Sequence, residues 1–279
     1  MQLALSVRVA ESFANKRVAD IALADLAQIA RAAGYAALCM RASQVGVHST
    51  PAQIAQARQV LDATGLAVSM VTGDFAVPEN GAAGPDCLRN ITPYLDLAAA
   101  LGSNLIRICM KHEADIPFAQ RAADEAAERG IRLAHQSHTQ SIFETVAGSL
   151  DILGRVGRAN FGMIYEPANL ALCGENYGVA TLQALQPYLF NVYVQNHAPD
   201  PAGILPTTTW ARGQIQSTLR PLDEPGGIDF TQVFDGLRAI GYPGYVTCHQ
   251  AFGNMLPPAE AAQRSAAFLR SKWQVAGGK

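Results

Sequence analysis

Apolar and polar positions alternate in four stretches of the second half of the chain, and each stretch runs into a polar side chain that can bind a metal ion. The stretches are IRLAHQSH (131–138), FGMIYEP (161–167), FNVYVQNH (190–197) and YVTCHQ (245–250). Successive side chains of a β-strand point to opposite faces, so parity separates the two kinds of position. One class holds the apolar residues Ile131, Leu133, Met163, Tyr165, Val192, Val194, Val246 and Cys248. The other class holds Gln136, Glu166, Gln195 and His249.

These two classes fit a barrel of parallel strands. In such a barrel the apolar side chains face the surrounding helices, and inward polar side chains at the carboxyl ends of the strands meet the substrate. We therefore expect the four polar residues to converge at one end of the barrel.

A repeated rhythm along the chain supports the same fold. Alanine-rich helical segments stop at glycine and give way to a strand, as in RAAGYAALCM and AERGIRLA, because glycine supplies the left-handed residue that follows a helix. The rhythm predicts strands at 3–7, 36–40, 67–71, 104–109, 131–136, 161–166, 190–196 and 245–249. It predicts helices at 20–33, 51–64, 86–101, 118–129, 142–156, 178–187, 229–240 and 258–273. Eight alternating units indicate one (β/α)₈ TIM barrel domain over residues 1–279.

Two further features sharpen this prediction. No GxGxxG follows the first strand, which removes the main signal for a dinucleotide-binding sheet. The stretch 197–228 exceeds an ordinary loop and lies on the mouth side of the barrel, where long loops are usually functional.

Composition narrows the class of partner. The chain has 279 residues, 49% apolar and 16% charged, with a formal net charge of −2. It contains no run of Lys and Arg, which argues against nucleic acid as a partner. No basic leader and no apolar run of about 18 residues is present, so we expect no membrane partner and a cytoplasmic location. A homo-oligomer is compatible with these features.

Five scattered cysteines indicate reduced thiols. They are Cys39, Cys87, Cys109, Cys173 and Cys248, without a CxxC pair. An odd number in a chain without a predicted signal peptide disfavours a disulfide framework.

Nearly the whole chain, and most strongly residues 130–253, resembles the xylose isomerase-like barrels. These include sugar phosphate isomerases and epimerases, hydroxypyruvate isomerase, inosose dehydratase and tagatose epimerase. The residues that carry the resemblance are IRLAHQSH, GMIYEPAN, VYVQNH and GGIDFTQVFDGLRAIGYPGYVTCHQAF. In that family Glu, Asp, His or Gln, and Glu at the ends of strands five to eight hold one divalent ion, and the two Glu also move protons. By position the resemblance implies the metal set Gln136, Glu166, Gln195 and His249.

This chain departs from the family pattern in ways that bear on the metal. Gln136 and His249 stand where the family has Glu, and Glu166 stands where it has Asp. The four positions thus carry one formal negative charge, and a neutral amide attracts Mg²⁺ or Mn²⁺ less strongly than a carboxylate does. A set of His, Glu and Gln still suits Mn²⁺, Co²⁺, Zn²⁺ or Fe²⁺. Retention and loss of a divalent metal ion both remain open.

The same departures shift the expected proton chemistry to histidine. Gln136 cannot accept a proton at neutral pH, whereas His249 titrates near it and can act as base or acid. Opposite Glu166, it would allow proton abstraction next to a carbonyl. His138 shares the parity of Gln136 and sits just beyond the strand, so it is either a catalytic neighbour, which we favour, or a loop histidine bonded to the backbone. His135 has the opposite parity and is expected to point to the helices.

Other residues are candidates for binding substrate. His197 follows Gln195 at the mouth, and Asn169 follows Glu166 on the next loop, where it either binds a hydroxyl group or stabilises a turn. In the long loop, Trp210 and Arg212 lie together, and a Trp ring either stacks on a sugar or packs in the core. Arg107 has inward parity on the fourth strand, so it either bridges barrel carboxylates or reaches a substrate anion.

These features favour a carbohydrate enzyme that performs enolisation-type proton transfer on a keto-sugar or keto-polyol, an isomerase or epimerase. A lyase or dehydratase that uses His249 or His138 as base is the alternative within enzymes. A sugar-binding barrel without catalysis is the alternative outside them. An endonuclease IV-like enzyme requires a richer zinc cluster and a cationic groove, and the sequence shows neither.

Overall fold

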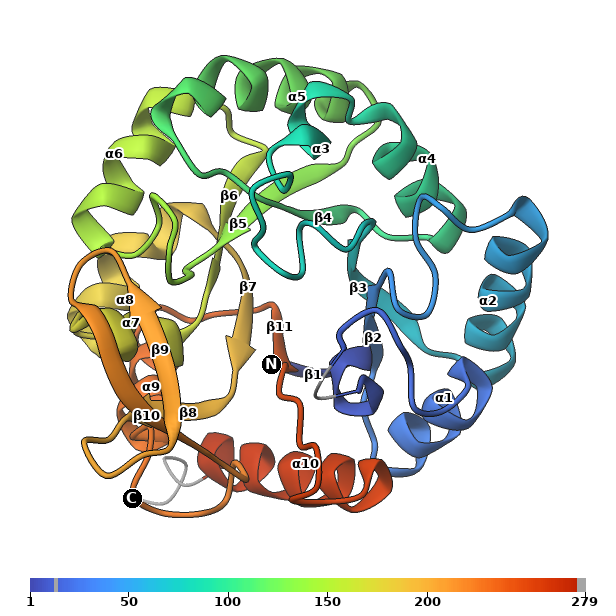
Figure 1. The fold of residues 1–279 in the computed structure, drawn as a ribbon. Helices are drawn as coiled ribbons and strands as arrows, with labels where there is room; N and C mark the ends of the chain where they lie inside the picture. The colour runs from blue at the N-terminus through green and yellow to red at the C-terminus, as the bar shows by residue number, and fades with distance from the viewer. Residues whose placement is uncertain (13–14, 275–279) are drawn as a thin grey trace.

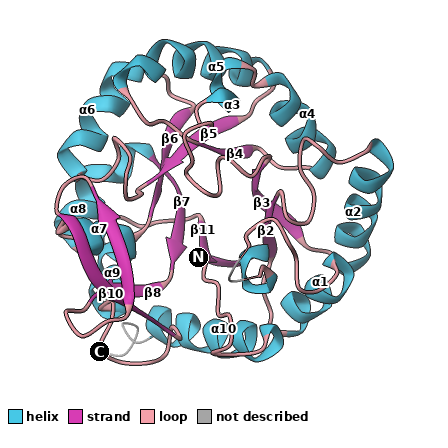
Figure 2. Cartoon of the chain, viewed as in Figure 1, coloured by secondary structure: helices cyan, strands magenta, loops and turns pink. Residues whose placement is uncertain are grey.

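Eight parallel strands close into a barrel that helices surround (Figures 1 and 2). The computed structural model describes residues 1–12 and 15–274. The barrel strands are β1 (Gln2–Ser6), β2 (Ala37–Arg41), β3 (Ala67–Thr72), β4 (Leu105–Ile108), β5 (Arg132–Gln136), β6 (Phe161–Tyr165), β7 (Leu189–Val194) and β11 (Tyr245–Cys248). Each pairs in parallel with the next, and β11 closes the ring against β1. The predicted (β/α)₈ TIM barrel is confirmed.

The helices follow the strands as the rhythm predicts. The outer helices are α1 (Leu23–Ala32), α2 (Pro51–Thr64), α4 (Thr92–Leu101), α5 (Ile116–Glu128), α6 (Val146–Val156), α8 (Val179–Leu185), α9 (Phe230–Ala239) and α10 (Pro258–Gln274). Short helices α3 (Asp86–Arg89) and α7 (Pro167–Cys173) precede two of them. The segment 86–101, which the pattern predicts as one helix, is two, because the backbone of Asn90 leaves the helical region at φ −144° and ψ 81°.

Parity divides the strand side chains as expected. Outward residues such as Leu133, Met163 and Val192 pack in the main core between strands and helices. A separate buried cluster is formed by the inward class, Cys39, Met70, Leu105, Ala134, Ile164 and Tyr193. This apolar layer fills the barrel below its mouth, so the next inward residue on each strand lies nearer the carboxyl end.

The stretch 197–228 is a small antiparallel sheet rather than a long loop. Its strands are β8 (Asn196–Pro199), β9 (Leu205–Thr209) and β10 (Gly213–Arg220), with β10 in the centre. The sheet lies beside α7 and α8 at one side of the barrel (Figure 1). Its β9–β10 turn is fastened by Glu144, whose carboxylate accepts the backbone N–H groups of Trp210 and Ala211 at 2.7 Å each.

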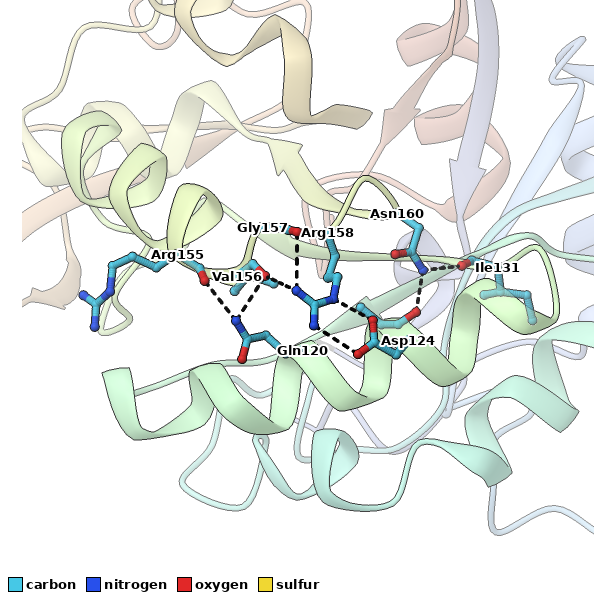
Figure 3. Close-up of polar contacts among 9 residues, drawn as sticks. Gln120, Asp124, Ile131, Arg155, Val156, Gly157, Arg158 and Asn160 are labelled. Atoms are coloured by element: carbon cyan, nitrogen blue, oxygen red, sulfur yellow. Dashed lines mark hydrogen bonds and ion pairs between the residues drawn. The ribbon is translucent and has the colours of Figure 1, made fainter.

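Helices α5 and α6 illustrate how the outer layer is held (Figure 3). The last carbonyls of a helix have no partner within it. Gln120 of α5 donates to the carbonyls of Arg155 and Val156 at 3.1 and 3.3 Å, and Arg158 forms an ion pair with Asp124 at 2.6 Å. The side chains of one helix thus satisfy the end of the next and fix the position of β6.

Two further predictions from the sequence concern the cysteines and the hydropathy of the helices. All five cysteines are free and buried. Among residues 1–12 and 15–274, no helix has the length and apolar character needed to cross a membrane.

Candidate active site

A cavity of about 180 Å³ opens at the carboxyl ends of the barrel strands. Its lining residues come from both halves of the chain: Arg8, Lys16, Pro78, Arg107, Gln136, His138, Thr139, Asn169, Leu172, Gln195, His197, Thr207 and His249. The structure therefore brings together three of the four predicted metal ligands and several predicted substrate-binding residues. The volume suits a small metabolite.

The fourth predicted ligand, Glu166, lies behind this lining and is fully buried. Gln136 donates an amide N–H to Glu166 Oε2, and Gln195 donates one to Oε1. Asn169 also donates to Oε2, at 3.0 Å. Burial raises the pKa of Glu166 to about 8, against the opposing charges of Arg107 and Arg8. Glu166 thus orders the three amides that face the cavity.

His249 is held between two neighbours at the end of β11. Its ring stacks on Tyr193 at a centroid distance of 3.7 Å, and Nδ1 lies 3.0 Å from the Ser6 hydroxyl. Burial lowers the pKa of His249 well below its usual value, and the charges of Arg41, Arg8 and Arg107 lower it further. The imidazole is therefore neutral at physiological pH.

His138 and His197 lie at the rim of the same cavity. His138 donates from Nδ1 to the Thr139 carbonyl at 2.7 Å; because a carbonyl only accepts, the lone pair of a neutral His138 is on Nε2. His197 Nε2 pairs with the Ser217 hydroxyl at 2.8 Å. Burial lowers the pKa of His138 well below its usual value and that of His197 to about 4.

Two basic side chains of this cavity, Arg8 and Lys16, are not among the residues predicted from the sequence. Arg8 follows β1 in the short 3₁₀ helix Val7–Ala10, and Lys16 lies in the next loop. Burial, followed by the charge of a neighbouring arginine, lowers the pKa of Arg8 to about 10 and that of Lys16 to about 7. Because β1 ends at Ser6 and Arg8 lies in a 3₁₀ helix, strand parity does not apply to Arg8, and no local sequence signal marks either cation.

The fold and the site invite comparison with known proteins. The family model described as xylose isomerase-like TIM barrel matches residues 27–272. This chain belongs to the xylose isomerase-like TIM barrel family. A search of curated proteins finds no match.

Solved structures of xylose isomerase-like proteins share the fold at low sequence identity. The probable 3-DHS dehydratase AsbF of Bacillus anthracis has a TM-score of 0.71 at 15% identity, with 97% of this chain and 99% of that chain covered. D-allulose 3-epimerase from Methylomonas sp. has a TM-score of 0.70 at 17% identity, with 98% of each chain covered. A xylose isomerase-like protein of Mycobacterium smegmatis, solved with magnesium, has a TM-score of 0.70 at 17% identity, with 98% and 97% covered.

The donor set of this xylose isomerase-like chain does not fit a divalent cation. Both oxygens of Glu166 already accept amide N–H groups, and Arg107 and Arg8 are the charges that act most strongly on it. A cation in this place would meet one carboxylate and several positive charges. Gln136 Oε1 is buried without a hydrogen-bond partner among the described residues, and a ligand N–H or O–H would satisfy it.

The remaining candidates lie at different depths. Asn169 lines the cavity and is held by Glu166 and the Ser137 carbonyl. Trp210 lies outside the described lining; its ring is half exposed and stacks on His112 at 6.3 Å. Arg212 packs near Gly174 and donates to the Leu172 carbonyl at 3.5 Å. His135 lies outward, stacked on Phe143 at 4.1 Å.

Proposed function

We propose that this chain is an isomerase or epimerase of carbohydrate metabolism, which moves a proton at a carbon next to the carbonyl of a small keto-sugar or keto-polyol. One observation carries the proposal: His138 and His249 line one cavity of metabolite size, each with one ring nitrogen engaged by the protein. The xylose isomerase-like family, whose solved relatives include a D-allulose 3-epimerase, supports it.

The chemistry uses the two imidazoles as proton carriers. His138 acts as the first base. Its Nδ1–H donates to the Thr139 carbonyl, so the neutral ring is the tautomer that keeps a lone pair on Nε2. The imidazolium that this step forms on His138 returns the proton at the neighbouring carbon. His249 Nε2 has no hydrogen-bond partner within residues 1–12 and 15–274, so this neutral ring can also remove a proton, and it returns one only after it has taken one up. The amides of Gln136, Asn169 and Gln195 orient hydroxyl groups. No step passes through a metal ion, since the donor set does not fit one.

Neutral imidazoles set the pH dependence. A base must be unprotonated, and burial keeps the pKa of both His138 and His249 well below 6.5. We therefore expect activity to persist below pH 6.5 rather than fall off at the ordinary histidine value.

Deuterium exchange tests this function directly. The protein is incubated in D₂O with D-fructose, D-allulose and other small keto-sugars and keto-polyols, and mass spectrometry follows uptake of deuterium next to the carbonyl. Exchange that His138→Gln or His249→Gln abolishes supports the proposal. His48→Gln, outside the cavity lining, is the matched control.

Two other outcomes point elsewhere. Loss of water from the substrate after exchange would assign the lyase chemistry, for which the same neutral imidazoles are suited. Binding of a sugar without exchange in any substrate of the panel would contradict the enzyme proposal and leave a sugar-binding barrel.

A further inference from the structure

The cavity has a strong charge imbalance. Among its thirteen described lining residues, three are basic (Arg8, Lys16 and Arg107) and none is acidic. With a pKa of about 7, Lys16 carries its charge only in part at neutral pH, whereas the two arginines are charged. The buried Glu166 behind the lining offers at most one negative charge. A small cavity with this balance attracts anions, because low-dielectric walls strengthen the field of the cations.

Arg107 is the most informative of the three cations. It lies on β4 with inward parity and is only 3% exposed. Within residues 1–12 and 15–274 its side chain makes no hydrogen bond or ion pair, and its Nε is buried without a partner. A buried charge is costly unless it is paired. The Arg107 guanidinium thus lacks both a counter-ion and a hydrogen-bond acceptor among the described residues.

The neighbouring Arg41 differs from Arg107 in having a counter-ion. Arg41, at the end of β2, is fully buried, and its Nε donates to Glu11 at 2.6 Å, while Ser43 donates to the same carboxylate. Its two terminal nitrogens have no hydrogen-bond partner among the described residues, so the ion pair alone offsets its charge. The chain therefore supplies a counter-ion for the arginine that lies outside the cavity lining, and none for the arginine that faces the cavity.

We propose that the substrate is an anion whose carboxylate or phosphate group binds between Arg107, Arg8 and Lys16. Arg107 offers the planar pair of N–H groups that matches two oxygens of such a group, and Arg8 and Lys16 close over it from the loop after β1. The inference rests on the proposed function only in that the same cavity holds the substrate. The anionic end lies on the side of β1 and β4, and the carbonyl end lies toward His138 and His249.

Isothermal titration with three six-carbon probes at constant ionic strength tests the anion site. D-gluconate carries a carboxylate, D-fructose 6-phosphate carries a phosphate monoester, and D-fructose carries neither. At least one anion should bind about tenfold or more tightly than D-fructose, and the stronger of the two identifies the group. Equal binding of all three probes contradicts the proposal.

Arg107→Met is the decisive variant. It should weaken binding of the preferred anion by about 10- to 100-fold. Without ligand it should melt at the same temperature as the wild-type protein or higher, because it removes an unpaired buried charge. Arg121→Met, the same change on the exposed surface of α5, should alter neither binding nor preference. An Arg107→Met protein that binds the anion normally overturns the site.

Lys16→Met provides a second route if Arg107→Met does not fold. Lys16 is half-buried in a loop, so Lys16→Met should leave the fold intact and should weaken binding of the anion by a smaller factor than Arg107→Met does. Unchanged affinity in this variant would contradict its place in the site. The two proposals can be contradicted separately. If the anion binds in a way that depends on Arg107 but no deuterium exchange occurs, only the proton-transfer function is contradicted. Exchange on neutral sugars that Arg107→Met does not change sinks only the anion site.

Discussion

The cavity has two sides, and different halves of the chain build them. Residues before position 110 supply basic side chains, Arg8, Lys16 and Arg107, which exchange no proton with the substrate in the proposed chemistry. Residues after position 130 supply neutral groups, three histidines and three side-chain amides. The first side suits binding and the second suits proton transfer.

The two sides are also coupled electrostatically. After burial, the first cause that lowers the pKa of His138 is the charge of Arg107, and for His249 it is the charge of Arg41. The cationic side therefore keeps the imidazoles in the form that accepts a proton. A bound anion would offset part of this charge and raise both pKa values, which would tune the bases when substrate is present.

Kinetics should separate the two sides most strongly. His138→Gln or His249→Gln should lower kcat by roughly 10²–10⁴-fold, since each removes a proton carrier. Arg107→Met should act mainly on KM, because it removes binding that is the same in ground and transition states. Steady-state kinetics on the substrate found by deuterium exchange measures both. Equal loss of kcat in all three variants would show that the sides do not divide the work.

Acid stability is the next largest effect. His135, His138, His197 and His249 all have a lowered pKa in the folded protein, chiefly through burial, with His135 at about 3. Their unfolded forms bind protons below about pH 6.5, so the stability they contribute is present above this pH and lost as pH falls. Each should cost up to about 1.6 kcal/mol of unfolding free energy between pH 6.5 and 5, so the four together should cost up to about 6 kcal/mol.

Urea denaturation at both pH values measures this loss. His249→Gln should become less acid-sensitive than the wild-type protein, while His112→Gln, an exposed position, should keep the full sensitivity. A wild-type protein equally stable at pH 6.5 and 5 would mean that its buried histidines protonate without cost.

The sequence predicted one side of the cavity well. Alternation in the last four strands indicated that Gln136, Gln195 and His249 face inward, and the structure places them in one lining. Period-two patterns determine which face a side chain takes, so this information is local. The eight strands were predictable from another local signal, the glycine that ends each helix before the next strand begins.

On the other side, parity predicted that Arg107 faces inward, but it could not predict Arg8 or Lys16. Arg8 and Lys16 follow a strand of five residues, and nothing in their neighbourhood shows that β1 closes against β11 and turns them toward Arg107. Whether Glu166 has room for a metal was also hidden, because it depends on which amide donors reach its oxygens. Such contacts join segments that are about 30 residues apart.

Glu166 should affect stability in the opposite direction to the histidines. Its folded pKa is raised by burial to about 8, so the folded protein prefers the protonated form. Its contribution to stability is complete below the unfolded pKa of about 4.3 and is lost as pH rises through 8. Glu166→Gln, which resembles the protonated form, should therefore exceed the wild-type protein in unfolding free energy by up to about 5 kcal/mol at pH 9 and by little at pH 4.

Thermal unfolding of both proteins across this range checks the sign. If Glu166→Gln instead loses stability at pH 9, the amides of Gln136 and Gln195 stabilise the carboxylate more than burial penalises it. The side of the cavity built by residues after position 130 would then hold a fixed negative charge. The difference in charge between the two sides would be correspondingly larger.

The smallest effect concerns the sheet that borders the histidine side. Thr207 of β9 lines the cavity, and the β9–β10 turn depends on Glu144, whose two oxygens accept the N–H groups of Trp210 and Ala211. Glu144→Gln keeps one acceptor oxygen and turns an amide N–H toward the other donor. This should cost about 1 kcal/mol locally, so hydrogen exchange at 205–220 should accelerate about fivefold while the barrel strands stay protected. Glu175→Gln, whose carboxylate accepts the Val146 N–H at 3.0 Å outside this sheet, is the matched control. If the contact between Glu144 and the β9–β10 turn supports only the side of the cavity that carries the histidines, Glu144→Gln should lower turnover slightly and leave the affinity for the anion unchanged. A parallel loss of affinity for the anion would show that the sheet supports both sides of the cavity.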